Sequence, residues 1–498
     1  MTLVFSSAYP NNPASLFGHT IIRINQEKQN PLLDYGVNYA ASVPEGEVGI
    51  KYLFKGLFGL YPGAFGISPF YQKVLEYNEA ESRDLWEYDL AFNEAESKFW
   101  VKHLWELRFF SQFKYEFLDK NCSYQMIRSL QVIRPEITDW LPENFLYTLP
   151  GETIQVLKRN HPEFFLSIHF RPSHFRVLNN RYRFLNSKQK AKFRFDLKDG
   201  SLITNETDPY VLETLNSYYE YVKIQQQENA EFSTKEILRK IRVLRAKVGG
   251  WTEFPVMESA GGRTNQPDLA HSTRRISLTT SGGSNQLSDI GIRIRLGLHD
   301  LLNRDNGYEA NFGVSGGDLE ISKIVDPRGK SGFRIKRFEL VDLVSLQPMN
   351  SFHFPVSWQI FSGWRPLLER SPLAEKNAFE ILGGVGFTLE PFQDCLWMGA
   401  FFNIKSSINN VIPTNKWGSL SLEPFVYFRL NERLKAKFHL MSETAFQFSS
   451  APANRAALKL VYGLGNQFEF ASEFEQTLKS YLGQHSLNQF SMGLGMFF

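Results

Sequence analysis

Residues 289–299 read Asp-Ile-Gly-Ile-Arg-Ile-Arg-Leu-Gly-Leu-His, so apolar side chains alternate with polar or small ones along the whole stretch. Successive side chains of a β-strand point to opposite faces of its sheet. Strict alternation over this length therefore indicates a strand with one apolar and one polar face. The same rhythm recurs at 418–430, 434–440 and 467–474. It predicts that the C-terminal half consists of antiparallel β-strands.

Two architectures produce such alternation. In a soluble β-sandwich the polar face meets water, whereas in an outer-membrane β-barrel the polar face lines the lumen and the apolar face meets lipid. The segments approach the ~9–11 residues that a tilted strand needs to cross a bilayer. Their apolar faces are rich in aromatic residues, and the chain ends on such a segment, with Phe498 as its last residue. These features favour the barrel over the sandwich.

About twelve strands are expected from residue 271 onward, an even number that is typical of single-chain barrels. A barrel leaves no open edge, so the first and last strands should pair. On the last strand Phe490, Met492, Leu494, Met496 and Phe498 should face lipid. The predicted strands are 273–281, 288–298, 308–324, 333–345, 355–364, 378–389, 395–404, 418–430, 434–446, 454–463, 465–475 and 487–498.

Length and composition bound the remaining possibilities. A chain of 498 residues usually holds several domains, and we divide this one into a mixed domain at 1–150, a mostly helical connecting region at 151–265 and a barrel at 266–498. The net charge of +3 argues against a general nucleic-acid binder. The first residues lack a charged n-region and a cleavage site, so we expect that an export signal and an upstream segment are missing.

The mixed domain contains a cysteine in an unusual position. Asn121 is a good N-cap, which places Cys122 at the first residue of a helix predicted to run to about residue 133. The dipole and free N–H groups of a helix N-terminus stabilise a thiolate, so we expect a lowered pKa for Cys122. Cys395 lies in a predicted barrel strand, and neither a disulfide scaffold nor a zinc site is expected.

A cysteine nucleophile needs a base, and His19 on a strand predicted at 18–25 is the candidate. Taken singly, a cysteine is more often a small core residue and a histidine a satisfied member of its strand. A helix-capping cysteine and a strand histidine in one α+β region together predict a papain-like thiol site.

The third residue of the site follows from the predicted hairpin between the strand at 18–25 and a second strand at 31–40. A register that pairs His19 with Asn38 lets the amide orient the imidazole. Asp34 shares that face but lies four residues away, ~13 Å along the strand. Asn38 is therefore preferred as the third catalytic residue, with Asp34 as the alternative.

Residues 52–65 are dense in glycine and aromatic residues, which is poor material for a regular element. One interpretation is a loop packed on the domain. The functional interpretation is a lid whose side chains Phe54, Phe58, Tyr61 and Phe65 receive an acyl chain.

Several motifs in this domain resemble those of the Lnb-type lipoprotein N-acyltransferase periplasmic domain family. The resemblance covers roughly residues 1–150, and the C-terminal half is similar to the β-barrel often fused to that domain. The family is thought to have a permuted papain-like fold, related to NlpC-type peptidases and to lecithin retinol acyltransferase, in which histidine precedes cysteine. The matching stretches are Ala14–Thr20, Asp34–Ala41, Lys55–Gly59, Arg83–Tyr88, His103–Leu107 and Asn121–Tyr124.

The resemblance implies a thiol acyltransferase without a cofactor. Its donor would be a phospholipid, its intermediate an S-acyl group on Cys122, and its acceptor the N-terminal amine of a lipoprotein. The barrel would lie among outer-membrane lipids, with the N-terminal domain in the periplasm. Two alternatives stay open: a peptidoglycan amidase or peptidase with the same Cys–His chemistry, and a non-catalytic outer-membrane binding protein. An apolar groove at Cys122 would favour lipid, and a polar open cleft would favour peptidoglycan.

Overall fold

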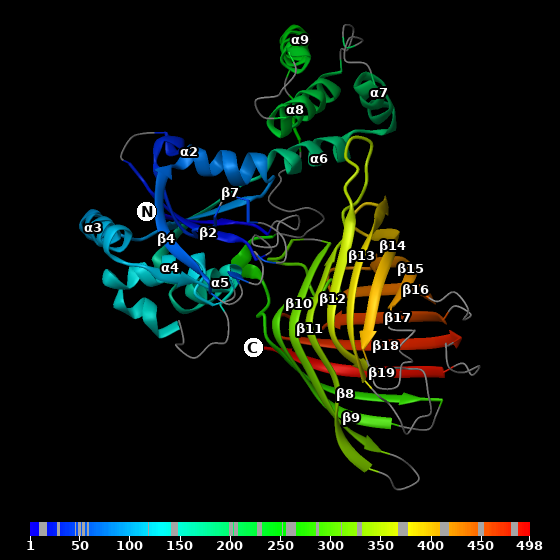
Figure 1. Cartoon of the computed structure of the whole chain (residues 1–498). Coiled ribbons are helices and arrows are strands. Elements are labelled where there is room, and N and C mark those ends of the chain that lie inside the picture. Colours follow the sequence, from blue (N-terminus) through cyan, green and yellow to red (C-terminus); the bar gives the residue numbers. More distant parts are fainter. Residues whose placement is uncertain are drawn as a thin grey trace. The chain divides into compact units, whose positions relative to one another are not determined.

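The computed structural model divides into two compact units (Figure 1). One comprises Met1–Ala260 with Gln266–Asp268, and the other comprises Gly261–Asn265 with Leu269–Phe498. The structure describes residues 1–8, 17–26, 30–44, 46–47, 51, 55–56, 59–117, 119–140, 148–198, 203, 208–226, 232–250, 252–254, 265–284, 288–309, 311–325, 331–366, 377–408, 418–446, 453–479 and 487–498.

The N-terminal unit is built on an antiparallel sheet of seven strands in the order β6-β4-β3-β2-β1-β5-β7. The central strand β2 lies between β1 and β3, so its side chains are covered on both faces. The strands are β1 (Thr2–Ser6), β2 (His19–Ile24), β3 (Tyr35–Ala41), β4 (Tyr61–Pro69), β5 (Leu85–Leu90), β6 (Phe113–Tyr115) and β7 (Phe165–Arg171).

Helices pack on both faces of this sheet, with α4 and α5 on one side and α2 on the other (Figure 1). A π-helix, Val74–Ala80, continues α2. None of the helices in the described part of the chain is long and apolar enough to cross a membrane. The helices are α2 (Phe70–Lys73), α3 (Glu94–Phe110), α4 (Cys122–Ser129), α5 (Pro150–Asn160), α6 (His174–Phe184), α7 (Ser187–Lys198), α8 (Pro209–Gln226) and α9 (Phe232–Val248).

Alternation along the central strands sorts the N-terminal core into two clusters. The larger one contains Phe5 and Ile22 and is covered by α4, whereas the smaller one contains Val4 and Ile21 and is covered by α2 and the π-helix. Thr20 pairs with Phe5, so its side chain points toward the larger cluster, and His19 pairs with Ser6 on the opposite face.

The predicted hairpin between the first two strands of the site is wrong in register. Ile21, not His19, pairs with Asn38, because the connection contains a 3-10 turn at Pro31–Leu33 and β3 begins only at Tyr35. Asn30 caps this turn by accepting a hydrogen bond from the Leu32 backbone. The two-residue shift preserves the face of each side chain but moves Asn38 away from the histidine along the strand.

The predicted lid is partly a strand. Tyr61 and Phe65 lie in β4, where alternate residues are buried, and both are core residues at 2% and 5% exposure. A glycine here allows close packing inside a regular strand, because a Cβ at Gly63 would lie 2.0 Å from the Tyr39 hydroxyl. The interpretation of Tyr61 and Phe65 as lid residues is therefore wrong. Phe54 and Phe58 lie outside the described residues.

The C-terminal unit is a closed antiparallel barrel of twelve strands. The last strand pairs with the first, with Leu494 opposite Leu278, which confirms the predicted closure. The strands are β8 (Arg275–Gly283), β9 (Ser288–His299), β10 (Phe312–Val325), β11 (Ser331–Ser345), β12 (Ser357–Pro366), β13 (Asn377–Phe392), β14 (Leu396–Ile408), β15 (Gly418–Arg429), β16 (Leu434–Ala445), β17 (Ala453–Gly463), β18 (Phe468–Lys479) and β19 (Leu487–Phe497).

Apolar side chains cover the outside of the barrel, and charged ones fill the inside. The alternate residues predicted to face lipid on the closing strand are all exposed, including Phe490 and Leu494. Inside, a cavity of about 300 Å³ is lined by groups of both signs, among them Arg293, Lys405 and Glu423. This distribution is that of a membrane barrel with a polar lumen rather than that of a sandwich.

The connection between β9 and β10 folds into the lumen. Leu302 is buried against the inward-facing rings Phe401 and Phe425. Asn303 accepts a hydrogen bond from Arg295 at 3.0 Å and donates one to Glu469 at 2.6 Å. This segment fills the barrel at the end where β8 begins.

Candidate active site

The structure confirms that Asn121 is the N-cap of α4. Its side chain accepts hydrogen bonds from the backbone N–H groups of Ser123 and Tyr124, at 3.1 and 3.2 Å. Asn121 is itself held by a hydrogen bond from its amide to the Phe117 carbonyl, at 3.4 Å. Cys122 is thereby fixed as the first residue of the helix, at the end where free N–H groups gather.

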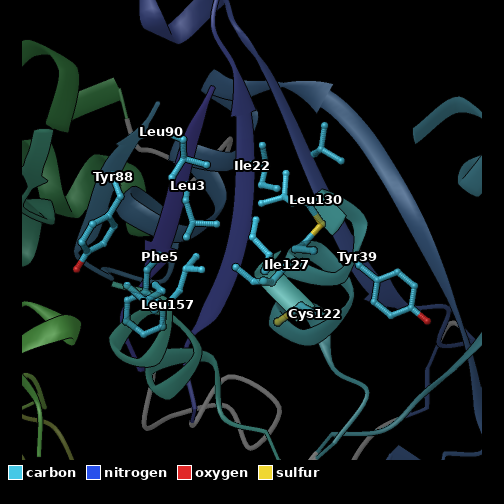
Figure 2. Packing of buried hydrophobic residues seen from close by; sticks show 14 of the residues in the cluster. Leu3, Phe5, Ile22, Tyr39, Tyr88, Leu90, Cys122, Ile127, Leu130 and Leu157 are labelled. Atoms are coloured by element: carbon cyan, nitrogen blue, oxygen red, sulfur yellow. The ribbon is translucent and has the colours of Figure 1, made fainter. Parts of the chain in front are cut away.

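The Cys122 thiol lies at the edge of the larger core cluster and is 2% exposed. Figure 2 shows it among buried apolar side chains that include Ile127 and Tyr39. The backbone N–H of Thr20 and the Tyr115 hydroxyl donate hydrogen bonds to the sulfur, as does the Ser123 backbone N–H. Donors from a strand end, an edge strand and a helix N-terminus therefore meet at one sulfur atom.

The expected lowering of the thiol pKa is wrong. Burial raises the pKa of Cys122, although the hydrogen bonds from Thr20, Tyr115 and Ser123 and the charge of Arg83 act in the opposite direction. The helix N-terminus contributes only about 0.3–1 kcal/mol, whereas removing an anion from water costs several times that amount. The thiol is therefore protonated in the resting protein.

His19 begins β2, directly after Gly18, which has a φ of +87°. Its ring centroid lies 5.3 Å from that of Tyr77 on the π-helix. Burial, together with the charges of Arg83 and Lys73, lowers the pKa of His19 to about 3. The imidazole is therefore neutral, and its buried Nε2 atom has no hydrogen-bond partner among the described residues.

The structure brings His19 and Cys122 near one another in space but on different faces of the sheet. The sulfur accepts a hydrogen bond from the backbone of Thr20, the residue after His19, whereas the imidazole points toward Tyr77 on the other face. No hydrogen bond joins the imidazole to the thiol in the described part of the chain. The strand pairing explains how the thiol reaches Thr20, because β2 pairs with β3 only from Ile21 onward.

Among the described residues, no hydrogen bond joins either candidate for the third residue to the imidazole. Asn38 is buried on the same face as His19 but pairs with Ile21. Asp34 is occupied elsewhere: it accepts a hydrogen bond from the Gln26 backbone at 2.9 Å and forms an ion pair with Arg23 at 3.5 Å. Asp34 therefore belongs to a buried charge network rather than to the thiol site.

Two further residues, Arg83 and Tyr77, lie at the site, and neither was chosen from the sequence. Arg83, 1% exposed, donates hydrogen bonds to the backbone carbonyls of Ser7 and Ser6 at 2.6 and 3.0 Å. Its guanidinium lies 5.1 Å from the centre of the Tyr77 ring. Two signals could have indicated them: Arg83 opens one of the family motifs, and a π-helix often marks a functional site.

The end of β1 and the start of β2 hold several buried polar atoms that have no hydrogen-bond partner within the described residues. They are Ser6 Oγ, Thr20 Oγ1 and His19 Nε2. Such atoms are costly, and their concentration at one place usually has a functional reason. The arrangement offers a nucleophile, a neutral base and backbone donors. No group of three or more His, Cys, Asp or Glu side chains within the described ranges is arranged to hold a metal ion.

The fold and the site define a class of protein: a cell-envelope protein in which an α/β domain with a buried thiol precedes an outer-membrane-type barrel. Residues 1–160 match the family described as Lnb N-terminal periplasmic domain, which confirms the resemblance seen in the motifs. Residues 264–496 match the family described as Domain of unknown function (DUF7840). No curated protein matches the chain.

Several solved outer-membrane structures are similar to the barrel part of the chain. The outer membrane channel from Pseudomonas putida F1 shares 8% identity over 46% of this chain and 96% of its own, with a TM-score of 0.32. The NanC porin shares 6% identity over 44% and 98%, with a TM-score of 0.28. Outer membrane phospholipase A from Escherichia coli shares 8% over 45% and 90%, with a TM-score of 0.25.

The match at residues 1–160 and the apolar exterior of the closed barrel agree on the location of the protein. A barrel with exposed apolar strands is stable only in a membrane, and the matched family is a periplasmic domain. The chain is an outer-membrane protein whose N-terminal unit lies in the periplasm.

Proposed function

We propose that the N-terminal unit is a papain-like, cysteine-dependent acyltransferase. It would move an acyl chain from a phospholipid through S-acyl-Cys122 to the N-terminal amine of a lipoprotein. One observation carries this proposal: in a region that matches the Lnb periplasmic family, a buried thiol at a capped helix N-terminus lies near a histidine whose Nε2 has no hydrogen-bond partner among the described residues. The apolar surroundings of the thiol favour an acyl substrate over a peptidoglycan one.

In the first step the Cys122 sulfur attacks the ester carbonyl of the phospholipid, and the thiol proton moves to His19 Nε2. Collapse of the tetrahedral intermediate breaks the ester C–O bond, and the imidazolium returns the proton to the departing lysophospholipid alkoxide. The N–H groups of Thr20 and Ser123 stabilise the negative charge as it develops on the sulfur. His19 must turn about the start of β2 to reach the thiol, and no hydrogen bond from the described part of the chain holds its Nε2 in place.

In the second step the lipoprotein amine attacks the thioester. The amide bond forms, the C–S bond breaks, and His19 transfers the amine proton to the leaving sulfur. The imidazole is neutral at rest, so its lone pair is free, but a pKa of about 3 makes it a weak base in the buried position. Turning out of that position would raise the pKa toward its usual 6.5, which suits proton transfer at neutral pH. Asn38 lies on the face from which the ring turns, so it is proposed to orient the imidazole there before the ring moves toward the thiol.

The test is intact-protein mass spectrometry of the full-length protein after incubation with phospholipid vesicles. The wild type and Cys395→Ser should gain one acyl mass, whereas Cys122→Ser and His19→Gln should not. Acylation of Cys122→Ser would overturn the thiol mechanism. Cleavage of peptidoglycan fragments by an unacylated wild type would favour the amidase alternative.

Because burial raises the pKa of Cys122, its reactivity should be low rather than high. At about pH 7, where only the thiolate reacts, iodoacetamide should modify exposed Cys395 faster than buried Cys122. Peptide mapping over time measures both rates in one sample. Faster modification of Cys122 would show that the thiol is ionised in the resting protein.

A further inference from the structure

Helix α3 of the N-terminal unit exposes aromatic side chains on one face. Its inner face buries Trp100 and Leu104 completely, which fixes the orientation of the helix on the domain. Its outer face exposes Trp105 by 60% and Phe109 by 54%, and their ring centroids lie 4.5 Å apart. Phe99 and Phe110 are exposed beside them. Four exposed aromatic residues on one helix are unusual for a surface that meets only water.

Basic residues accompany these rings. Lys98, Lys102, Trp105 and Phe109 follow the i, i+4, i+7, i+11 spacing that places side chains in one stripe along a helix. Arg108 is exposed as well, with its guanidinium 5.6 Å from the Phe109 ring centre.

The charges are unevenly distributed along the helix. Residues 98–110 contain three basic side chains, Lys98, Lys102 and Arg108, but only one carboxylate, Glu106. The other two acids of the helix, Glu94 and Glu96, lie in its first turn. Glu96 closes a capping box with Asn93, and Lys98 forms an ion pair with Glu94. The aromatic part of the surface is therefore also its basic part.

We infer that this surface of α3, formed by Phe99, Trp105, Phe109 and Phe110 with the basic residues around them, docks on the surface of a phospholipid bilayer with anionic headgroups. Tryptophan and phenylalanine insert at the headgroup level, while lysine and arginine reach anionic phosphates on their long side chains. The barrel anchors the chain in a membrane, so a bilayer surface is always within reach of the N-terminal unit that is joined to the barrel.

The docking surface lies close along the chain to a strand, β6, that contacts the thiol. Two residues separate Phe110 from β6, and Tyr115 at the end of β6 donates a hydrogen bond to Cys122. Phe113, on the same short strand, is exposed by 38%. A domain that rests on lipid through α3 would hold this edge of the sheet near the bilayer. The inference concerns docking and is independent of the chemistry at Cys122.

The test uses the full-length protein with Cys395→Ser, reconstituted in vesicles, with a nitroxide attached at Phe109→Cys. The matched control carries the nitroxide at Leu75→Cys, another exposed apolar residue of the same unit, on the π-helix. Electron paramagnetic resonance compares collisions with oxygen, which enters lipid, and with a nickel chelate, which stays in water. Heat-modifiable gel migration confirms that every variant contains a folded barrel.

In vesicles of phosphatidylcholine with phosphatidylglycerol, the label at position 109 should give a severalfold higher ratio of oxygen to nickel collisions than the label at position 75. Adding Lys98→Glu and Lys102→Glu should lower that ratio to the control value. Equal ratios at both positions would overturn the inference. Spin–spin broadening at position 109 would also overturn it, since a second copy of the chain would then cover the surface.

Discussion

Apolar and polar residues alternate along the strands of both units, but the apolar side chains are buried in the N-terminal unit and face outward in the barrel. In the N-terminal unit, the apolar side chains of the central strands are buried, among them Leu3 and Ile22, both 0% exposed. In the barrel, Leu494 is 49% exposed and Arg295 is 1% exposed. The medium beyond the exposed face, water or lipid, determines which side chains are buried.

The difference extends to buried charges. The lumen keeps its charged groups and pairs them, as Lys405 pairs with Glu443 at 2.8 Å and with Glu380 at 3.3 Å. At the thiol site the N-terminal unit instead holds a titratable pair that is neutral, because burial lowers the pKa of His19 and raises that of Cys122. Pairing offsets the cost of burying charges in the lumen, whereas a neutral thiol and a neutral imidazole are the starting state that the proposed proton transfer requires.

The largest expected effect is the loss of a buried aromatic residue from the N-terminal unit. Trp100→Ala removes a fully buried ring and the hydrogen bond that its Nε1 donates to Ser129 at 3.0 Å. The free energy of unfolding of this unit should fall by about 3–5 kcal/mol. Urea unfolding followed by circular dichroism measures it, and gel migration shows whether the barrel stays folded.

The control for this variant lies five residues along the same helix. Trp105→Ala removes an exposed ring, so the free energy of unfolding measured in detergent should change by no more than about 0.5 kcal/mol. Equal losses for Trp100 and Trp105 would mean that the outer face of α3 is also buried against protein. That result would contradict both the burial pattern and the inferred docking surface.

The second effect tests the reversed pattern in the barrel. Leu494→Arg puts a charge on the lipid face of the closing strand and should reduce barrel stability by roughly 2–4 kcal/mol if the site lies at mid-bilayer. Gln489→Arg on the same strand lines the polar cavity and should cost less. Folding titrations in phospholipid vesicles compare the two. A larger loss for Gln489→Arg would indicate an apolar lumen.

The barrel could be predicted from the sequence because lipid imposes alternation on every strand and tolerates no open edge. Twelve segments, their approximate ends and the pairing of the closing strand with the first strand follow from that constraint alone. In the N-terminal unit, the capped helix at Cys122 was equally predictable, since Asn121 is a strong local signal.

The geometry of the site depends on contacts that no local pattern contains. The register of Asn38 was wrong because a 3-10 turn at Pro31–Leu33 shortens β3. The sequence shows that His19 lies on a strand but not which face α4 covers, so it could not predict that the imidazole and the thiol point to different faces. The thiol pKa was wrong because it depends on burial among residues distant in sequence.

The smallest expected effect is a change in how the stability of the N-terminal unit depends on pH, which tests whether His19 is neutral in the folded protein. The unfolded chain binds a proton at His19 below its usual pKa of 6.5, whereas the folded protein does so only near about 3. Between these values the unfolded state holds one more proton. The stability due to the neutral imidazole is therefore complete above pH 6.5, and below it falls with pH by at most about 1.4 kcal/mol per pH unit.

In His19→Gln, urea midpoints of the N-terminal unit should fall less between about pH 7 and about pH 5 than in the wild type. Tyr77→Phe keeps the ring beside the imidazole and should retain the wild-type slope. If His19→Gln retains it too, the pKa of His19 is close to its usual 6.5 in the folded protein, and the contrast with the charged lumen does not hold.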